Sequence, residues 1–129
     1  MSEAGPSVPG FPRLGTLEAQ VMDVLWDHGP VTIREVIDHL PNDPAYTTIA
    51  TVLANLDRKD LVSVTRVGRS ARHAARMSRQ QYDAALMECV LESSRDRAAS
   101  ILHFVDTMPE GDRALLRDYL VRHDPERAG

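Results

Sequence analysis

The 129-residue sequence predicts a mainly helical protein with one small β-hairpin. Apolar residues recur at helical spacing through most of the chain, whereas residues 61–76 are rich in β-branched residues around a central glycine. Only two Phe and one Trp are present, so the core has to come mainly from Leu, Val, Ile and Ala. The length suits one domain, or one domain with a short dependent appendage.

The first predicted helix follows a tail rich in Gly, Pro and Ser, which we expect to be disordered over residues 1–13. Thr16 is expected to cap this helix, because its hydroxyl can accept hydrogen bonds from amides two or three residues on. Leu17, Val21, Val24 and Leu25 follow helical spacing. The Gly-Pro pair at residues 29–30 then ends the helix.

The second predicted helix begins with a capping box formed by Thr32 and Glu35. Apolar residues at i, i+3, i+4 and i+7 give it one buried face, and Pro41 ends it. Val31, just before the capping box, is expected to form a single short strand.

The third predicted helix, residues 46–59, has an apolar face and an opposite face of short polar side chains. Its buried stripe consists of Ile49, Val52, Leu53 and Leu56. At 100° per residue the opposite face is free of carboxylates, and its members are Thr47, Thr48, Thr51, Ala54, Asn55 and Arg58.

A β-hairpin is expected next, with alternating segments on either side of Gly68. Arg66, Arg69, Arg72 and Arg76 decorate its strands and its turn. The order helix, short strand, helix, helix, hairpin is that of a winged helix-turn-helix, which binds DNA through the second helix of the motif. We therefore predict a DNA-binding domain over residues 14–77, with residues 46–59 as its recognition helix and the hairpin as its wing.

The last third predicts three short amphipathic helices over residues 78–123, opened by a capping box of Ser78 and Gln81. A unit this small has a marginal core of its own, so we expect its apolar faces to pack against a second copy of the chain. The final residues, 124–129, are expected to be flexible. The candidate dimerisation residues are Tyr82, Leu86, Ile101, Leu102, Val105, Leu116 and Leu120.

Charge is distributed unevenly although the net charge is only −4. Residues 45–80 contain seven basic and two acidic residues, a net charge of +5. The segments on either side, residues 1–44 and 81–129, carry net charges of −5 and −4. A positive stretch between two acidic ones is the pattern expected of a nucleic-acid-binding face.

The candidate DNA-binding residues fall into two groups, those expected to contact bases and those expected to contact phosphates. Threonine and asparagine side chains on the first turns of a recognition helix can hydrogen-bond base edges in the major groove. Arginines suit phosphates, which fix register and give salt-dependent affinity. The residues are Tyr46, Thr47, Thr48, Thr51, Asn55, Arg58, Arg66, Arg69 and Arg72.

The sequence contains few features typical of an enzyme or a metal-binding protein. The five histidines lack metal-ligand spacing, a single Cys89 excludes an intrachain disulfide, and neither a Gly-rich phosphate loop nor a nucleophile elbow is present. We expect no catalytic residue, cofactor or metal. No apolar run reaches the roughly 20 residues that cross a bilayer, so we expect a cytoplasmic protein without a membrane partner.

Two other functions remain open on the residues alone. The domain could be an adaptor whose positive stretch meets an acidic protein partner. It could also be a DNA-binding regulator gated by a small molecule bound between the winged domain and the C-terminal helices.

Four motifs carry a resemblance to a known family. They are LEAQVMDVLW at residues 17–26, AYTTIATVL at 45–53, LDRKDLV at 56–62 and the wing pair Gly68-Arg69. Over about residues 14–120 the chain resembles the penicillinase repressor family, the BlaI and MecI group of winged-helix regulators. The Tyr-Thr-Thr-Ile segment together with the early Trp26 is the most specific part of the match.

The resemblance implies a homodimer that binds an inverted-repeat operator and represses genes, often those for β-lactam resistance. It also implies release by proteolysis, in which a membrane-bound sensor metalloprotease leads to cleavage in the dimerisation region before a Phe in an Asn-Phe-Val context. His103 and Phe104 match that site, except that His103 replaces the Asn. The copper-responsive branch carries a C-terminal cysteine motif, which residues 122–129 lack.

Overall fold

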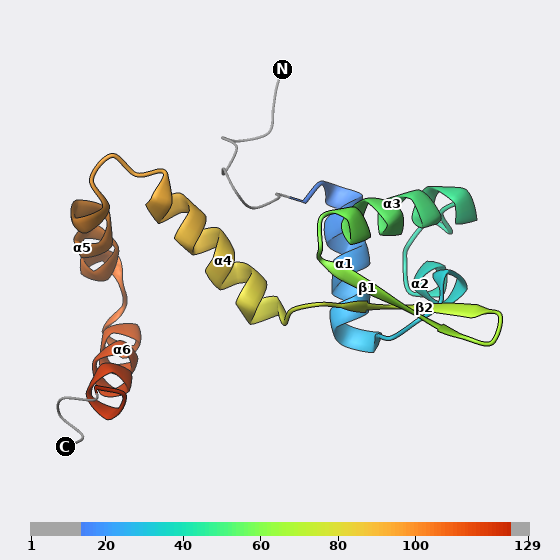
Figure 1. The fold of residues 1–129 in the computed structure, drawn as a ribbon. Helices are drawn as coiled ribbons and strands as arrows, with labels where there is room; N and C mark the ends of the chain where they lie inside the picture. The colour runs from blue at the N-terminus through green and yellow to red at the C-terminus, as the bar shows by residue number, and fades with distance from the viewer. Residues whose placement is uncertain (1–13, 125–129) are drawn as a thin grey trace. The chain divides into compact units, whose positions relative to one another are not determined.

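The computed structural model describes residues 14–124, which divide into two compact units. The first unit ends at Cys89 and the second begins at Val90. The elements are mainly helical with a single two-stranded sheet, which confirms the predicted fold class (Figure 1). The tails expected at residues 1–13 and 124–129 lie outside the described residues, except for Asp124.

Helix α1 (Thr16–His28) begins one residue earlier than the sequence suggested. Gly15, not Thr16, is its N-cap, and the backbone N–H of Gly15 donates to the Glu18 carboxylate at 3.0 Å. The expected cap at Thr16 is therefore wrong, because the Glu18 side chain reaches back and Thr16 already has helical geometry. At the other end the Gly29 N–H donates to Leu25 O at 3.0 Å, as expected for a glycine-terminated helix.

Helices α2 (Ile33–Asp38) and α3 (Tyr46–Arg58) form the helix-turn-helix. The predicted capping box is confirmed: the Thr32 N–H donates to Glu35 Oε1 at 2.9 Å, and the Glu35 N–H donates to Thr32 Oγ1 at 3.2 Å. Helix α3 ends within one residue of its predicted end, with Lys59 as the C-cap.

Strands β1 (Val62–Val67) and β2 (Ser70–Ala75) form the predicted antiparallel hairpin. Gly68 has a φ of +62° in the turn between them, a conformation that glycine adopts without strain. Val31 pairs with His73 through backbone hydrogen bonds of 2.9 and 2.7 Å, which confirms the expected short strand as an isolated bridge. The hairpin is thereby tied to the segment between α1 and α2.

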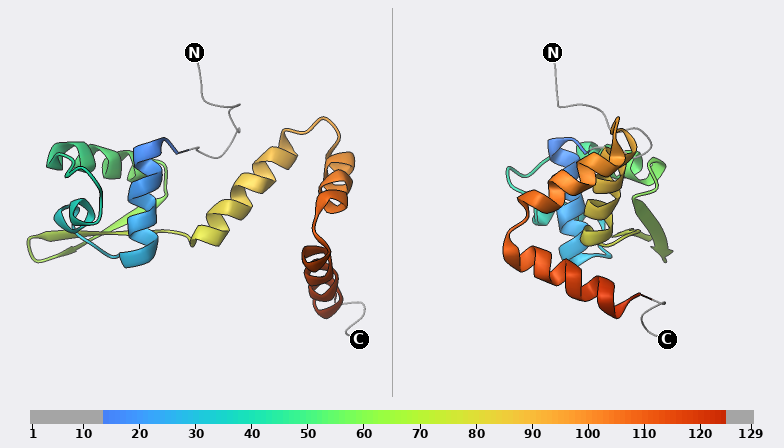
Figure 2. Two further views of the ribbon diagram at one scale, coloured as in Figure 1. Left: turned by 180° about the vertical axis from the view of Figure 1, so that it is seen from behind. Right: turned by 90° about the vertical axis from the view of Figure 1, so that its left-hand side faces the viewer.

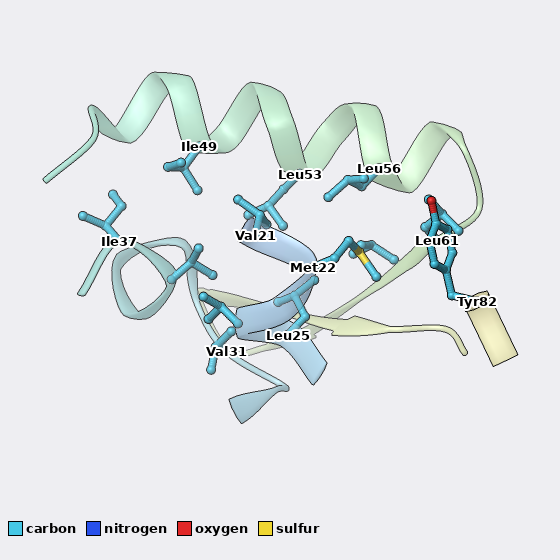
Figure 3. Close-up of a cluster of buried hydrophobic side chains, with 13 residues drawn as sticks. Val21, Met22, Leu25, Val31, Ile37, Ile49, Leu53, Leu56, Leu61 and Tyr82 are labelled. Carbon is cyan, nitrogen blue, oxygen red and sulfur yellow. The ribbon is translucent and has the colours of Figure 1, made fainter. Parts of the chain in front are cut away.

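The core of the first unit lies between α1, α2, α3 and the hairpin. In Figure 3, Ile49, Leu53 and Leu56 point from α3 toward Val21 and Met22 of α1. All five side chains are buried. At about 25 cal/mol per Å² of apolar surface, this shared burial is what fixes α3 against the rest of the unit.

The start of α4 (Arg79–Glu92) belongs to this core, which differs from the expected boundary at residue 77. Tyr82, expected to face a second copy of the chain, is only 6% exposed and packs among the core residues of its own chain (Figure 3). Its ring lies 5.8 Å from that of Trp26, whose Nε1 donates to Met77 O at 2.8 Å. Leu86 packs partly buried against the same core.

The second unit contains the last residues of α4 followed by α5 (Arg97–Thr107) and α6 (Glu110–Arg122) (Figure 2). Asp96 caps α5 by accepting a hydrogen bond from the Ala99 N–H at 3.1 Å. Neither α5 nor α6 has a buried residue. Within residues 14–124, no helix is long and apolar enough to cross a membrane.

Candidate nucleic-acid interface

The polar face of α3 is exposed because the opposite face supplies the core. Ile49, Leu53 and Leu56 are almost completely buried, which turns the other side of the helix toward solvent. On that side Thr47, Thr48, Thr51 and Arg58 are exposed and Asn55 is half-buried, so all five of these predicted site residues share one surface. Short side chains on such a face can approach base edges closely.

One edge of the exposed face of α3 lies beside the hairpin. At 100° per residue, Tyr46, Ala50, Ala54 and Asp57 lie on one side of the exposed face, and all four line a groove between α2, α3 and the hairpin. Thr48 and Asn55 lie on the opposite side of that face. Helix α3 therefore presents a polar face with a groove along one edge.

This groove has a volume of about 530 Å³, and we call it the wing groove. Among its charged lining residues are three arginines, from α2, the hairpin strand β1 and the hairpin turn, and one aspartate from α3. Its lining consists of Thr32, Ile33, Arg34, Tyr46, Ala50, Leu53, Ala54, Asp57, Val64, Arg66, Arg69, Ser70, Ala71 and His73. A concave surface with this excess of positive charge favours an anion.

Arg34 was not predicted from the sequence as a site residue. Its guanidinium carbon lies 5.6 Å from the centre of the Tyr46 ring, within the range of a cation–π contact. Arg34 lies in the acidic N-terminal stretch of the sequence, and only the packing of α2 beside α3 brings it to the wing groove. Its place on the first helix of the helix-turn-helix could have marked Arg34 as a candidate phosphate contact. The sequence does not show, however, which side of α2 faces the wing.

The wing arginines differ in their surroundings. Arg66 and Arg69 are exposed and line the wing groove. Arg72 is half-buried, and its Nη1 lies 3.4 Å from Glu35 Oε1. The hydrogen bond from the Thr32 N–H is the main cause that lowers the pKa of Glu35. Burial opposes it, and the charge of Arg72 lowers the pKa further.

The end of α3 carries two basic residues with different environments. Arg58 is exposed, whereas Lys59 is bound to the Glu18 carboxylate of α1. Burial raises the pKa of Glu18, but the hydrogen bonds from Gly15 and Lys59 and the charges of Lys59 and Arg58 lower it overall. Arg58 is therefore the residue at this end with its charge directed to solvent.

A buried histidine lies beside the same groove. His73 is 6% exposed, its side chain Nδ1 lies 3.4 Å from Val31 O, and its backbone forms the bridge to Val31. Burial lowers the pKa of His73, and the charge of Arg66 adds to that effect. The contact with Val31 O and the charge of Asp57 oppose it.

The remaining predicted residues lie in the second unit. Ile101, Leu102 and Leu120 are exposed, while Val105 and Leu116 are half-buried. His103 and Phe104 are exposed near the middle of α5, so the peptide bond between them lies within a helix. Among the described residues, no group of three or more His, Cys, Asp or Glu side chains is arranged to hold a metal ion.

Comparison with known proteins identifies the family. The model of the penicillinase repressor family matches residues 14–122. The transcriptional regulator BlaI of Mycobacterium tuberculosis, from strains CDC 1551/Oshkosh and ATCC 25618/H37Rv, is 40% identical over 111 residues, covering 81% of this chain and 80% of the relative. A MarR family protein from Bacillus stearothermophilus aligns with a TM-score of 0.45 and 13% identity, covering 90% of this chain and 76% of that one. The family match and the mycobacterial relative show that this chain belongs to the penicillinase repressor family.

Proposed function

We propose that the protein is a transcriptional repressor that places α3 in the major groove of an operator and the hairpin against the adjacent backbone. The observation that carries this proposal is that two surfaces lie side by side: the polar face of α3, which has no carboxylate, and the wing groove along its edge, which is lined by arginines. The names of the family and of the mycobacterial relatives support it. No catalytic role is assigned to any residue.

Base reading is assigned to the exposed polar residues of α3. Thr47, Thr48 and Thr51 can hydrogen-bond a base or offer a methyl group to thymine, and Asn55 can form a bidentate pair with adenine. Phosphate contacts are assigned to Arg58, Arg66 and Arg69, whose side chains are exposed. Arg72 can join them only by exchanging Glu35 for a phosphate.

Dimerisation is assigned to the second unit. Helices α5 and α6 bury no residue within one chain, and Leu102 and Leu120 are 64% and 58% exposed. A second copy that covers these faces removes the apolar surface from water. A symmetric dimer would place two copies of α3 in successive major grooves about 34 Å apart, which suits an inverted-repeat operator.

Control of β-lactam response genes and release by cleavage between His103 and Phe104 rest on the family likeness. Cleavage at this bond requires α5 to open locally, because a protease cannot bind a bond that is held within a helix. A sensor-linked protease would therefore act on an opened form of the second unit.

The test is selection of genomic DNA fragments bound by the full chain, followed by binding measurements with Thr51→Ala and Asn55→Ala. We expect each variant to weaken operator binding and to alter sequence preference at one position, by about 1–3 kcal/mol. Thr16→Ala, at the exposed start of α1, is the matched control and should bind as the wild type does. If Thr51→Ala and Asn55→Ala both leave operator affinity unchanged, α3 is not the reading element.

A further inference from the structure

We infer that Arg34, held over the ring of Tyr46, binds a DNA backbone phosphate in the wing groove, and that Tyr46 serves as its platform and does not itself contact DNA. The inference rests on the proposed function and adds an anchor from α2 to a surface otherwise built from α3 and the hairpin. It also gives Tyr46, an expected DNA contact, a different role.

The first supporting observation is that no carboxylate among the described residues 14–124 forms an ion pair with Arg34. Its contact in the part of the chain that the structure describes is the Tyr46 ring at 5.6 Å. The neighbouring carboxylate, Glu35, is already engaged by the Thr32 backbone and by Arg72. The positive charge of Arg34 therefore remains available to an external anion.

The second observation is the convergence of arginines from separate elements. Arg34 lines the wing groove from α2, while Arg66 and Arg69 line it from the hairpin. Asp57 is the acidic residue among the lining side chains. Ala50 and Ala54 keep the α3 wall low, so an elongated, negatively charged chain can enter beside the helix. A DNA strand that leaves the major groove next to a recognition helix has this chemistry.

The contact with Tyr46 explains how Arg34 can be ready for binding before DNA arrives. A guanidinium can lie on an aromatic ring while its N–H groups, which point outward in the guanidinium plane, remain able to donate to phosphate oxygens. Because the ring already restricts the long side chain, less rotamer freedom is lost on binding. This function needs the aromatic ring of Tyr46 and not its hydroxyl group.

The first experiment compares the salt dependence of operator binding by wild type, Arg34→Ala, Arg69→Ala and Arg76→Ala. The slope of log K against log salt should fall by about 0.9 in Arg34→Ala, as for loss of one phosphate contact, with sequence preference unchanged. Affinity should fall about tenfold. Arg76→Ala removes the same charge from a different hollow, formed with Trp26 and Gly29, and should keep the wild-type slope.

The second experiment separates the ring of Tyr46 from its hydroxyl. Tyr46→Phe should bind as the wild type does, whereas Tyr46→Leu should weaken binding with unchanged sequence preference. In the Arg34→Ala background, Tyr46→Leu should reduce operator affinity little further, because the guanidinium that the ring positions is already absent. Thermal melting of each variant confirms that the affected side chains, both exposed, leave the fold intact.

The outcomes distinguish this inference from the proposed function. A wild-type slope in Arg34→Ala, combined with a reduced slope in Arg69→Ala, would overturn the role of Arg34 and leave the repressor proposal standing. A loss in Tyr46→Phe as large as in Tyr46→Leu would show that the hydroxyl contacts DNA and would overturn the platform. If the wild type binds no DNA fragment in a salt-dependent way, both the inference and the proposed function fail.

Discussion

Lys59 Nζ donates hydrogen bonds to both carboxylate oxygens of Glu18, at 3.2 Å to Oε1 and 2.9 Å to Oε2. The pair joins the end of α3 to the first turn of α1, and Glu18 also caps α1 through Gly15. Two neighbouring basic residues at the end of α3 therefore have different surroundings. Arg58 is directed to solvent, whereas Lys59 stabilises the packing that positions α3.

Lys59→Met should lower stability without changing the electrostatics of DNA binding. We expect the free energy of unfolding in urea to fall by about 1 kcal/mol, because the pair is only partly exposed and loses two charge-assisted hydrogen bonds. The salt slope of operator binding should stay at the wild-type value. A slope reduced by as much as in Arg69→Ala would show that Lys59 contacts DNA instead.

Glu35→Gln should strengthen DNA binding. The amide can still accept the hydrogen bond from the Thr32 N–H, but it no longer holds the charge of Arg72, which becomes available to a phosphate. We expect operator affinity at 100 mM salt to rise about twofold, measured by fluorescence anisotropy. Glu110→Gln, which loses contacts with Arg113 and Arg117 in the second unit, is the control. Unchanged or weaker binding by Glu35→Gln would mean that the pair with Arg72 does not compete with DNA.

His73 should make the stability of the protein depend on pH. Burial lowers its pKa from the ordinary value of 6.5, so the unfolded chain takes up a proton at a higher pH than the folded protein does. Its contribution is therefore complete above about pH 6.5 and is lost as the pH falls through the folded pKa. Urea unfolding from pH 7.5 to 5 should show a smaller decline for His73→Asn than for wild type.

The chosen pH range separates His73 from the two carboxylates with lowered pKa values. Glu18 and Glu35 have pKa values below 4.5, so their contributions are present above that pH and are lost only in more acidic solution. Parallel stability curves for wild type and His73→Asn between pH 7.5 and 5 would show that burial of His73 carries no penalty for protonation.

Leu116→Asp should shift the protein from dimer to monomer and abolish tight operator binding. Leu116 is half-buried in α6, a helix without a fully buried residue, so a charge there disfavours association with a second copy. Gly111→Asp adds the same charge to the same helix where a new Cβ meets nothing within 4 Å, and should remain dimeric. Sedimentation measures both. A wild type that is monomeric and still binds the operator tightly would refute the assigned role of the second unit.

By itself the sequence determined the elements of this protein and their order. The signals that indicate these elements act within a few residues, so they can be recognised without a structure. They are the spacing of apolar residues, capping boxes such as that of Thr32 and Glu35, and the glycine of the hairpin turn. The polar face of α3 followed from the same local geometry. The N-terminus of α1 was misplaced by one residue because Gly15 and Thr16 compete for the same local role.

Only the tertiary structure decided which basic residues are available to DNA. Lys59 is bound by a residue 41 positions away, and Arg72 by one 37 positions away. Arg34 reaches the wing groove because α2 packs beside α3, and Tyr82 enters the core because α4 meets Trp26. The charge pattern of the chain located the positive segment, but pairs between distant residues depend on how the helices pack, and a one-dimensional pattern does not contain that packing.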